Sequence, residues 1–163
     1  MDSKYIMDAN TFITAHRLWY PFDVAPSFWE QLVDKAADKM VIIEQVENEL
    51  LKGEDLLADW YEKQNANFIV LKIPDQEVIM AYRRIINFVS DNERYTPSAK
   101  EEFARVADSW LCAYALAYDS TIVTLETFDK DIKKRVKIPN MCIEFNIRYI
   151  SLPEFMREIG MRL

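Results

Sequence analysis

The chain of 163 residues is long enough for one compact domain over residues 1–163, and its 50% of hydrophobic residues supply a core without disulfide or metal staples. With only two glycines, Gly53 and Gly160, it cannot form a glycine-rich loop for nucleotide phosphates, and no apolar stretch approaches the ~20 residues that cross a membrane. The net charge of −7 argues against general affinity for nucleic acid, so any such binding must depend on local basic patches.

Short apolar runs that alternate with helical patterns predict an α/β fold. In chain order, strands are expected at Lys4–Asp8, Val41–Ile43, Phe68–Leu71, Thr121–Thr124 and Arg148–Ile150. Helices are expected to begin at Asn10–Thr11 and at Pro26, and then to cover Gln45–Leu51, Glu54–Gln64, Asp75–Val89, Ser98–Tyr118, a short stretch from Pro139, and Leu152–Ile159. Strands that alternate with helices imply a parallel sheet covered on both faces.

The two cysteines and a group of aromatic residues near the N-terminus give two further predictions. Cys112 and Cys142 share no metal-ligand or redox spacing, which predicts two buried thiols in a cytoplasmic protein kept reduced. Five aromatic residues crowd a short region near the N-terminus: Trp19, Tyr20, Phe22, Phe28 and Trp29. They either belong to the core or form an apolar patch for another chain.

Four acids from separate segments are expected to meet at the carboxyl edge of the sheet, where ligands bind in such folds. Asp8 ends the first strand, Glu126 follows the fourth, and Glu49 lies in the helix after the second. Asp108 lies inside the long helix, which is apolar nearly all round, so its carboxylate is costly there unless it is paired or metal-bound. The alternatives are a helix cap for Asp8 and ordinary solvent-facing acids for the other three.

Oxygen ligands without His or Cys favour Mg²⁺ or Mn²⁺, and such a centre can activate water for phosphodiester hydrolysis. Asn10 and Thr124 are suited to orienting the carboxylates or a water, and Asp129 or Asp131 can assist as a further acid. The strongest basic patch follows Glu126 and is expected to bind substrate phosphates; it contains Lys130, Lys133, Lys134 and Arg135. The alternative is a solvated surface segment.

Four pieces of the chain resemble, in order, the motifs of PIN domains, a family that includes the VapC-type toxins. They are Tyr5–Ile13 with its Asp8-Ala9-Asn10, Val46–Leu50, Ala107–Ala115 and Ile122–Glu126. Three other pieces resemble one PIN-like branch of unassigned function: Tyr20-Pro21, Phe28-Trp29 and Lys137–Cys142. Two positions depart from the PIN pattern, since Ala9 stands where Thr is usual and Glu126 where Asp is usual.

The resemblance implies a PIN-like three-layer sandwich with a central, mostly parallel five-stranded sheet flanked by helices. It implies a Mg²⁺- or Mn²⁺-dependent ribonuclease, the toxin of a type II toxin–antitoxin pair, with Asp8, Glu49, Asp108 and Glu126 as catalytic metal ligands. An antitoxin protein or a second copy of the chain is the implied partner.

Two other functions compete with this interpretation. One is a PIN-like module without strong catalysis that serves binding or regulation, which Ala9 and the acidic net charge favour. The other is a phosphatase of the haloacid dehalogenase type, suggested by Asp8-Ala9-Asn10-Thr11. That class needs an acid two residues after its nucleophilic Asp, and Asn10 cannot protonate a leaving group.

Overall fold

A computed structural model describes residues 4–163; Met1, Asp2 and Ser3 of the predicted domain lie outside the described residues. Its sheet has the strand order β3-β2-β1-β4-β5, and each neighbouring pair is parallel. The strands are β1 (Tyr5–Met7), β2 (Met40–Ile43), β3 (Ile69–Leu71), β4 (Thr121–Val123) and β5 (Tyr149–Ile150). The predicted five-stranded sheet is confirmed, and within the described residues it is parallel throughout.

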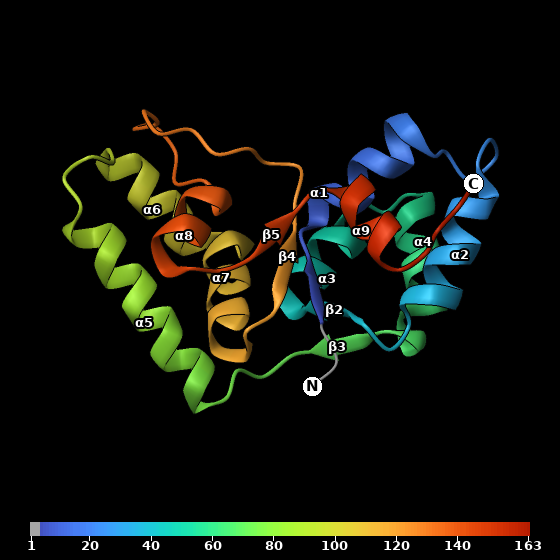
Figure 1. Cartoon of the computed structure of the whole chain (residues 1–163), viewed down its shortest axis with the longest axis horizontal. Helices are drawn as coiled ribbons and strands as arrows, with labels where there is room; N and C mark the ends of the chain where they lie inside the picture. Colours follow the sequence, from blue (N-terminus) through green and yellow to red (C-terminus); the bar gives the residue numbers. More distant parts are fainter. Residues whose placement is uncertain (1–3) are drawn as a thin grey trace.

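Helices cover the sheet on both sides, which gives three layers (Figure 1). They are α1 (Ala9–Thr14), the π-helix η1 (Ala15–Trp19), α2 (Pro26–Ala36), α3 (Glu44–Lys52), α4 (Leu56–Gln64), the 3₁₀-helix η2 (Asn65–Asn67), α5 (Gln76–Asp91), α6 (Pro97–Arg105), α7 (Ala107–Tyr118), α8 (Ile138–Phe145) and α9 (Leu152–Glu158). In Figure 1, helices α5 to α8 lie to one side of the strands, and α2, α4 and α9 lie to the other. No helix between residues 4 and 163 is both long and apolar enough to cross a membrane.

The strand order places a crevice at the carboxyl ends of β1 and β4. Strands β2 and β3 lie on one side of β1, whereas β4 and β5 lie on its other side. The direction in which the chain adds strands therefore reverses between β1 and β4. The amide of Asp8 donates to the carbonyl of Val123 at 3.0 Å, and that of Thr124 donates to Ile150 at 3.0 Å. Residues that follow these strands therefore meet at the point where doubly wound folds bind ligands.

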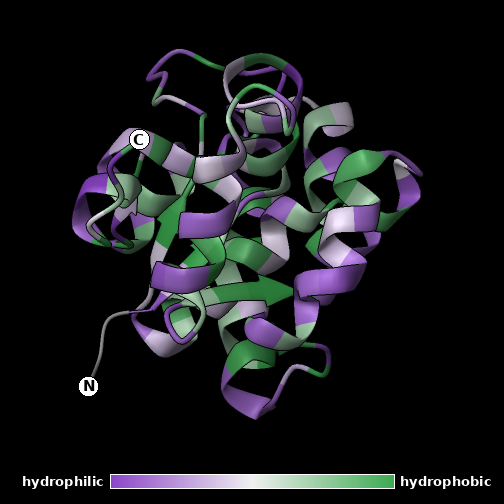
Figure 2. Cartoon of the chain, turned by 90° about the vertical axis from the view of Figure 1, so that its right-hand side faces the viewer, coloured by the Kyte–Doolittle hydropathy of each residue, from purple (hydrophilic) through white to green (hydrophobic). Residues whose placement is uncertain are grey.

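The core explains why such short strands persist. All residues of β1, β2 and β4 are buried, as expected for parallel strands with helices on both faces. Figure 2 shows the same division, with hydrophobic strands inside and hydrophilic residues on the outer faces of the helices. Helix α7 is buried on most faces, and both Cys112 and Cys142 are buried free thiols, as predicted.

One prediction about the helices is wrong, and it affects the site. The expected helix from Ser98 to Tyr118 is two helices, because Val106 is extended with φ −96° and ψ 174°. Thr96, not Ser98, caps α6 by accepting the amide of Ala99 at 3.1 Å. A β-branched residue such as Val106 tolerates the extended conformation well, but no glycine or proline marks the break in the sequence. Asp108 consequently lies in the first turn of α7 instead of mid-helix.

A buried acid outside the crevice gives a direct test of the fold. Glu47 on α3 is nearly buried and accepts the hydroxyl of Tyr61 at 2.6 Å; Lys72 lies 3.3 Å away. Tyr61→Phe leaves this carboxylate without its neutral donor and should lower the free energy of unfolding by about 1–3 kcal/mol, measured in urea. Tyr118→Phe is the matched control, because the partner carboxylate of that hydroxyl, Asp75, is exposed. An equal loss in the two variants would contradict the role given to burial.

Candidate functional site

Asp8 is the most buried acid of the crevice. It directly follows β1 and stands at the N-cap position of α1, yet its side chain makes no capping hydrogen bond. Instead its Oδ2 accepts the hydroxyl of Thr124, which follows β4, at 2.9 Å. The same Thr124 hydroxyl accepts the amide of Glu126 at 3.1 Å, so one threonine connects the segments that carry two of the acids.

Asp108 enters the crevice from the first turn of α7, with 18% of its side chain exposed. Burial, followed by the negative charges of Asp8 and Glu126, raises its pKa from the usual 3.8 to about 8, while Arg135 opposes the rise. The amino end of a helix carries partial positive charge, which favours an acid at this position. The break at Val106 thus places a carboxylate where α7 helps to hold it.

The carboxyl groups of the crevice act on one another. Burial raises the pKa of Asp8 to about 6, the Thr124 hydrogen bond opposes this, and the charges of Glu126 and Glu49 add to it. Glu49 also raises the pKa of Asp108, and partial burial raises the pKa of Glu49 itself. The four acids that the sequence singled out are therefore brought into one electrostatic neighbourhood.

A polar cavity of about 170 Å³ opens onto this neighbourhood. Its polar lining comes from five different elements or segments: Asn10, Glu49, Glu102, Asp108 and Arg135. Glu102 lies on α6 and was not predicted, because nothing in its sequence context separates it from the other charged residues of that helix. Asn10 is exposed and borders the same space as Glu49 and Asp108, as a side chain that orients a water or phosphate must.

Glu126 is held by structural contacts as well. Its Oε2 accepts the amide of Ile138, the first residue of α8, at 2.9 Å. Its Oε1 forms an ion pair with the guanidinium of Arg135, whose Nη2 also lies 3.8 Å from Oδ2 of Asp108. The side chain of Glu126 is only 10% exposed, so these contacts fix its direction.

The segment between β4 and α8 is held in place by hydrogen bonds from two residues outside the crevice, Arg94 and Asn140. Arg94 donates to the carbonyls of Ile132 at 2.8 Å and Asp129 at 3.1 Å. The buried Asn140 donates to the same Asp129 carbonyl at 2.8 Å. Neither Arg94 nor Asn140 was predicted, since the sequence gives no sign that these distant residues share a loop.

The remaining predicted residues of this segment face solvent. The exposed side chain of Asp129 accepts the amide of Asp131 at 3.0 Å, which engages it within its own loop. Lys130, Lys133 and Lys134 are exposed, whereas Arg135 turns back to the acids. The basic patch is thus divided into three outward lysines and one inward arginine.

The chemistry of the donor set suits a hard dication, although the acids do not form a ready ligand shell. Asp8, Glu49, Asp108 and Glu126 offer oxygen atoms only, which Mg²⁺ and Mn²⁺ prefer. Within residues 4–163, no three acid, His or Cys side chains are arranged so as to hold one ion together. Two of the acids, Glu126 and Asp108, are paired instead with a positively charged side chain, the guanidinium of Arg135.

The aromatic region near the N-terminus divides between core and surface. Phe28 and Trp29 are buried, and Tyr20 and Phe22 stack on them with ring centroids 4.4 and 4.3 Å apart. Trp19 is 47% exposed, and its neighbours along the chain include two further exposed apolar residues, Leu18 and Val24.

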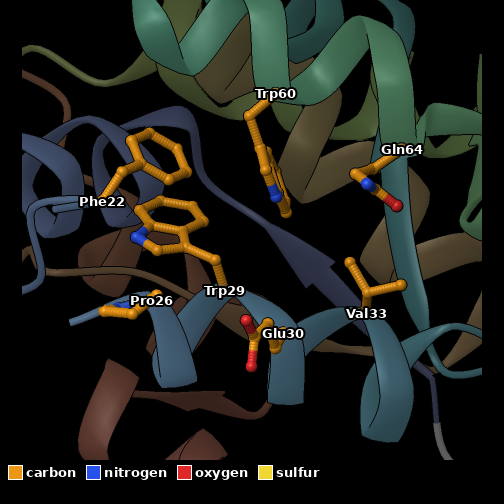
Figure 3. A pocket seen from close by; sticks show the side chains of 7 residues that line it. All are labelled: Phe22, Pro26, Trp29, Glu30, Val33, Trp60 and Gln64. Carbon is orange, nitrogen blue, oxygen red and sulfur yellow. The ribbon is translucent and has the colours of Figure 1, made fainter.

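The buried part of this region opens into a second cavity, of about 450 Å³, between α2 and α4. Figure 3 shows Phe22, Trp29 and Trp60 gathered on one side of it. Glu30, Val33 and Gln64 also line it. This cavity is separate from the acidic one, since the two share no lining residue.

Comparison with known proteins agrees with this architecture. The family model described as Domain of unknown function (DUF4411) matches residues 5–163. Among solved structures, the chain resembles one chain of VapBC2 from Rickettsia felis bound to a DNA fragment from their promoter. The TM-score is 0.53 and the identity 13%, over 90% of this chain and 97% of that chain, which shows a PIN-like fold. None of the curated proteins matches.

The raised pKa values of two acids predict how stability depends on pH. Folding takes up protons where the folded-state pKa values of Asp8 and Asp108, about 6 and about 8, exceed the usual 3.8. The unfavourable contribution is therefore absent below about pH 4, grows as the pH rises, and levels off above about pH 6 for Asp8 and about pH 8 for Asp108. For Asp8, the difference of about two pKa units corresponds to at most about 3 kcal/mol.

Asp8→Asn and Asp108→Asn should remove these contributions in the metal-free protein. Relative to the wild type, the melting temperature of Asp8→Asn should rise between about pH 4 and 6, and that of Asp108→Asn should continue to rise to about pH 8. The asparagine at position 8 can still accept the Thr124 hydroxyl, so its effect isolates the charge. Differences from the wild type that stay constant with pH would show that these carboxyls are not strained.

Proposed function

The chain belongs to the DUF4411 family and has a PIN-like fold, and from this premise we propose that it is a Mg²⁺- or Mn²⁺-dependent ribonuclease. The observation that carries the proposal is the meeting of Asp8, Glu49, Asp108 and Glu126 beside the carboxyl ends of β1 and β4, where their charges act on one another. A group of unneutralised acids is destabilising, and a bound dication offsets that repulsion.

The residues around the acids have distinct roles in the proposed hydrolysis of RNA phosphodiester bonds. Asp8, Glu49, Asp108 and Glu126 would hold the metal, which when bound activates water and stabilises negative charge on the phosphate. Thr124 fixes the direction of the Asp8 carboxylate, and Asn10 offers a neutral amide to a water or phosphate oxygen.

Substrate binding would depend on the outward lysines. Lys130, Lys133 and Lys134 lie on the braced segment that follows Glu126, exposed and close to it in sequence, so they can contact phosphates beside the acids. Asp129 supports this segment through its turn to Asp131 and is assigned no direct role at the metal.

We assign a biological role by extension, that of the toxin of a type II toxin–antitoxin pair. The similarity in fold to a chain of VapBC2 supports this role, which would make an antitoxin protein the natural partner and the cytoplasm the place where the two meet. The exposed Leu18, Trp19 and Val24 and the aromatic cavity between α2 and α4 offer apolar surface for such a partner or for a second copy.

A binding module without catalysis is the competing function, and two contacts favour it. Arg135 already neutralises part of the charge of Glu126 and Asp108, and Glu126 caps the amino end of α8. Through these contacts the two acids stabilise the fold without a bound metal. Cleavage measurements decide between the two functions.

Catalysis predicts a specific pattern of losses. Asp8→Asn and Asp108→Asn should each lower Mn²⁺-dependent cleavage of single-stranded RNA by more than the roughly 10–100-fold seen when a group that merely supports a ligand is lost. An amide keeps the shape of the side chain but binds a hard dication poorly. Glu126→Asp should retain activity if position 126 supplies only a carboxylate. Asp34→Asn, at an exposed acid of α2, is the matched control.

Two results would count against the enzyme. Cleavage that survives Asp8→Asn points to a contaminant, and absence of cleavage with both metals across varied RNAs favours the binding module. The fold of each variant is checked by circular dichroism, so that a lost activity is not a lost structure.

The outward lysines allow binding to be tested apart from chemistry. Lys133→Glu and Lys134→Glu should each weaken RNA binding and reduce the slope of log affinity against log salt by roughly 0.7, the value for one phosphate contact on a single strand. Lys63→Glu, at an exposed lysine of α4, makes the same change of charge elsewhere. A slope that falls equally in the control would show a general electrostatic effect. Fluorescence anisotropy over a salt series supplies the measurement.

The partner surface is tested most simply with a second copy of the chain. If Leu18, Trp19 and Val24 form a homodimer contact, the double substitution Trp19→Ser and Val24→Ser should convert dimers to monomers in sedimentation equilibrium. Ile73→Ser is the matched control, because Ile73 is 89% exposed and precedes α5. A wild type that is monomeric at all concentrations leaves a different protein as the partner of this surface.

A further inference from the structure

Arg135 already occupies the position of a bridging cation. Its Nη2 pairs with Oε1 of Glu126 and lies 3.8 Å from Oδ2 of Asp108. These two acids come from different elements, the segment after β4 and the first turn of α7, and the positive charge of Arg135 lowers the otherwise raised pKa of Asp108. Within residues 4–163, Arg135 is the basic side chain that forms ion pairs with the acids of the crevice.

The side chain of Arg135 can leave the crevice while its backbone stays in place. The loop is fixed upstream by Arg94 and Asn140, and the Lys133 carbonyl accepts the amide of Thr96 at 3.0 Å. Downstream, Val136 is buried and Ile138 begins α8. The Arg135 side chain itself is 51% exposed, so rotation about its own bonds can carry the guanidinium to solvent.

We propose that Arg135 is a built-in cation that competes with a divalent metal for Glu126 and Asp108. The inference rests on the metal site of the proposed function and adds a displacement step to it. A metal shared by these acids must contact their oxygens at roughly 2.0–2.6 Å, and the same lone pairs accept the guanidinium hydrogens, so the two cations exclude each other.

The competition accounts for two features of the crevice. In the metal-free protein, the guanidinium holds Glu126 and Asp108 in positions that suit an arginine, which explains why the acids converge without forming a ready ligand shell. Once displaced, the guanidinium remains attached beside the cavity that Asn10 and Glu49 line. There it is free to form the paired hydrogen bonds with a phosphate that suit a guanidinium.

Mn²⁺ binding to the full chain, measured by isothermal titration calorimetry, tests the competition without any RNA. Arg135→Gln should bind Mn²⁺ roughly tenfold or more tightly than the wild type, because the metal no longer displaces a charge-assisted hydrogen bond. Lys134→Gln, the same change of charge at the adjacent exposed residue, should bind within about threefold of the wild type, as expected for a screened charge. Asp8→Asn shows whether the heat belongs to this site.

Arg135→Lys guards against a variant that fails to fold. It retains the charge but offers no planar fork to span two acids, so its Mn²⁺ affinity should lie between those of the wild type and Arg135→Gln. Affinities of both Arg135 variants that equal that of the wild type, or fall below it, overturn the competition while leaving the metal site intact. Absence of Mn²⁺ binding in every variant at millimolar metal instead overturns the metal site, and the competition with it.

Discussion

Mutual repulsion among carboxylates at the carboxyl edge of the sheet is the constraint to which the rest of this structure responds. Asp8 and Asp108 are pushed well above their ordinary pKa values by burial and by neighbouring acids. The opposing contacts come from Thr124, from the amino end of α7 and from Arg135. A site of this kind is maintained only if the surrounding fold supplies stability that the site itself lacks.

That stability comes from a scaffold in which the elements that bear the acids are deeply buried. β1 and β4 are buried along their whole length, and α7 presents apolar residues on nearly all sides. Asp8, Thr124 and Asp108 therefore project from rigid elements, whereas Glu126 and Arg135 lie on a loop tied down by Arg94 and Asn140. On this fixed loop the half-exposed side chain of Arg135 can change its position while the backbone that bears Glu126 stays in place.

The acidic composition of the chain is compatible with a local positive surface beside the crevice. A net charge of −7 opposes general attraction to RNA, and the crevice contributes to that charge. The outward lysines of the segment after Glu126 provide a local positive surface in the same part of the molecule. Cations bound among the acids would extend it, since a dication is the largest local charge in such a site.

The sequence by itself determined the elements and the order of the acids, because apolar runs and helical spacing are local properties. These patterns predicted the five strands, the parallel sheet and the meeting of Asp8, Glu49, Asp108 and Glu126 at its carboxyl edge, and the resemblance to PIN domains implied the PIN-like fold. Tertiary structure alone decided the break at Val106, the turn of Arg135 toward Asp108 and the contacts by which Arg94 holds the loop before Arg135. These depend on contacts between residues far apart in the chain, whose balance of burial and charge no local pattern records.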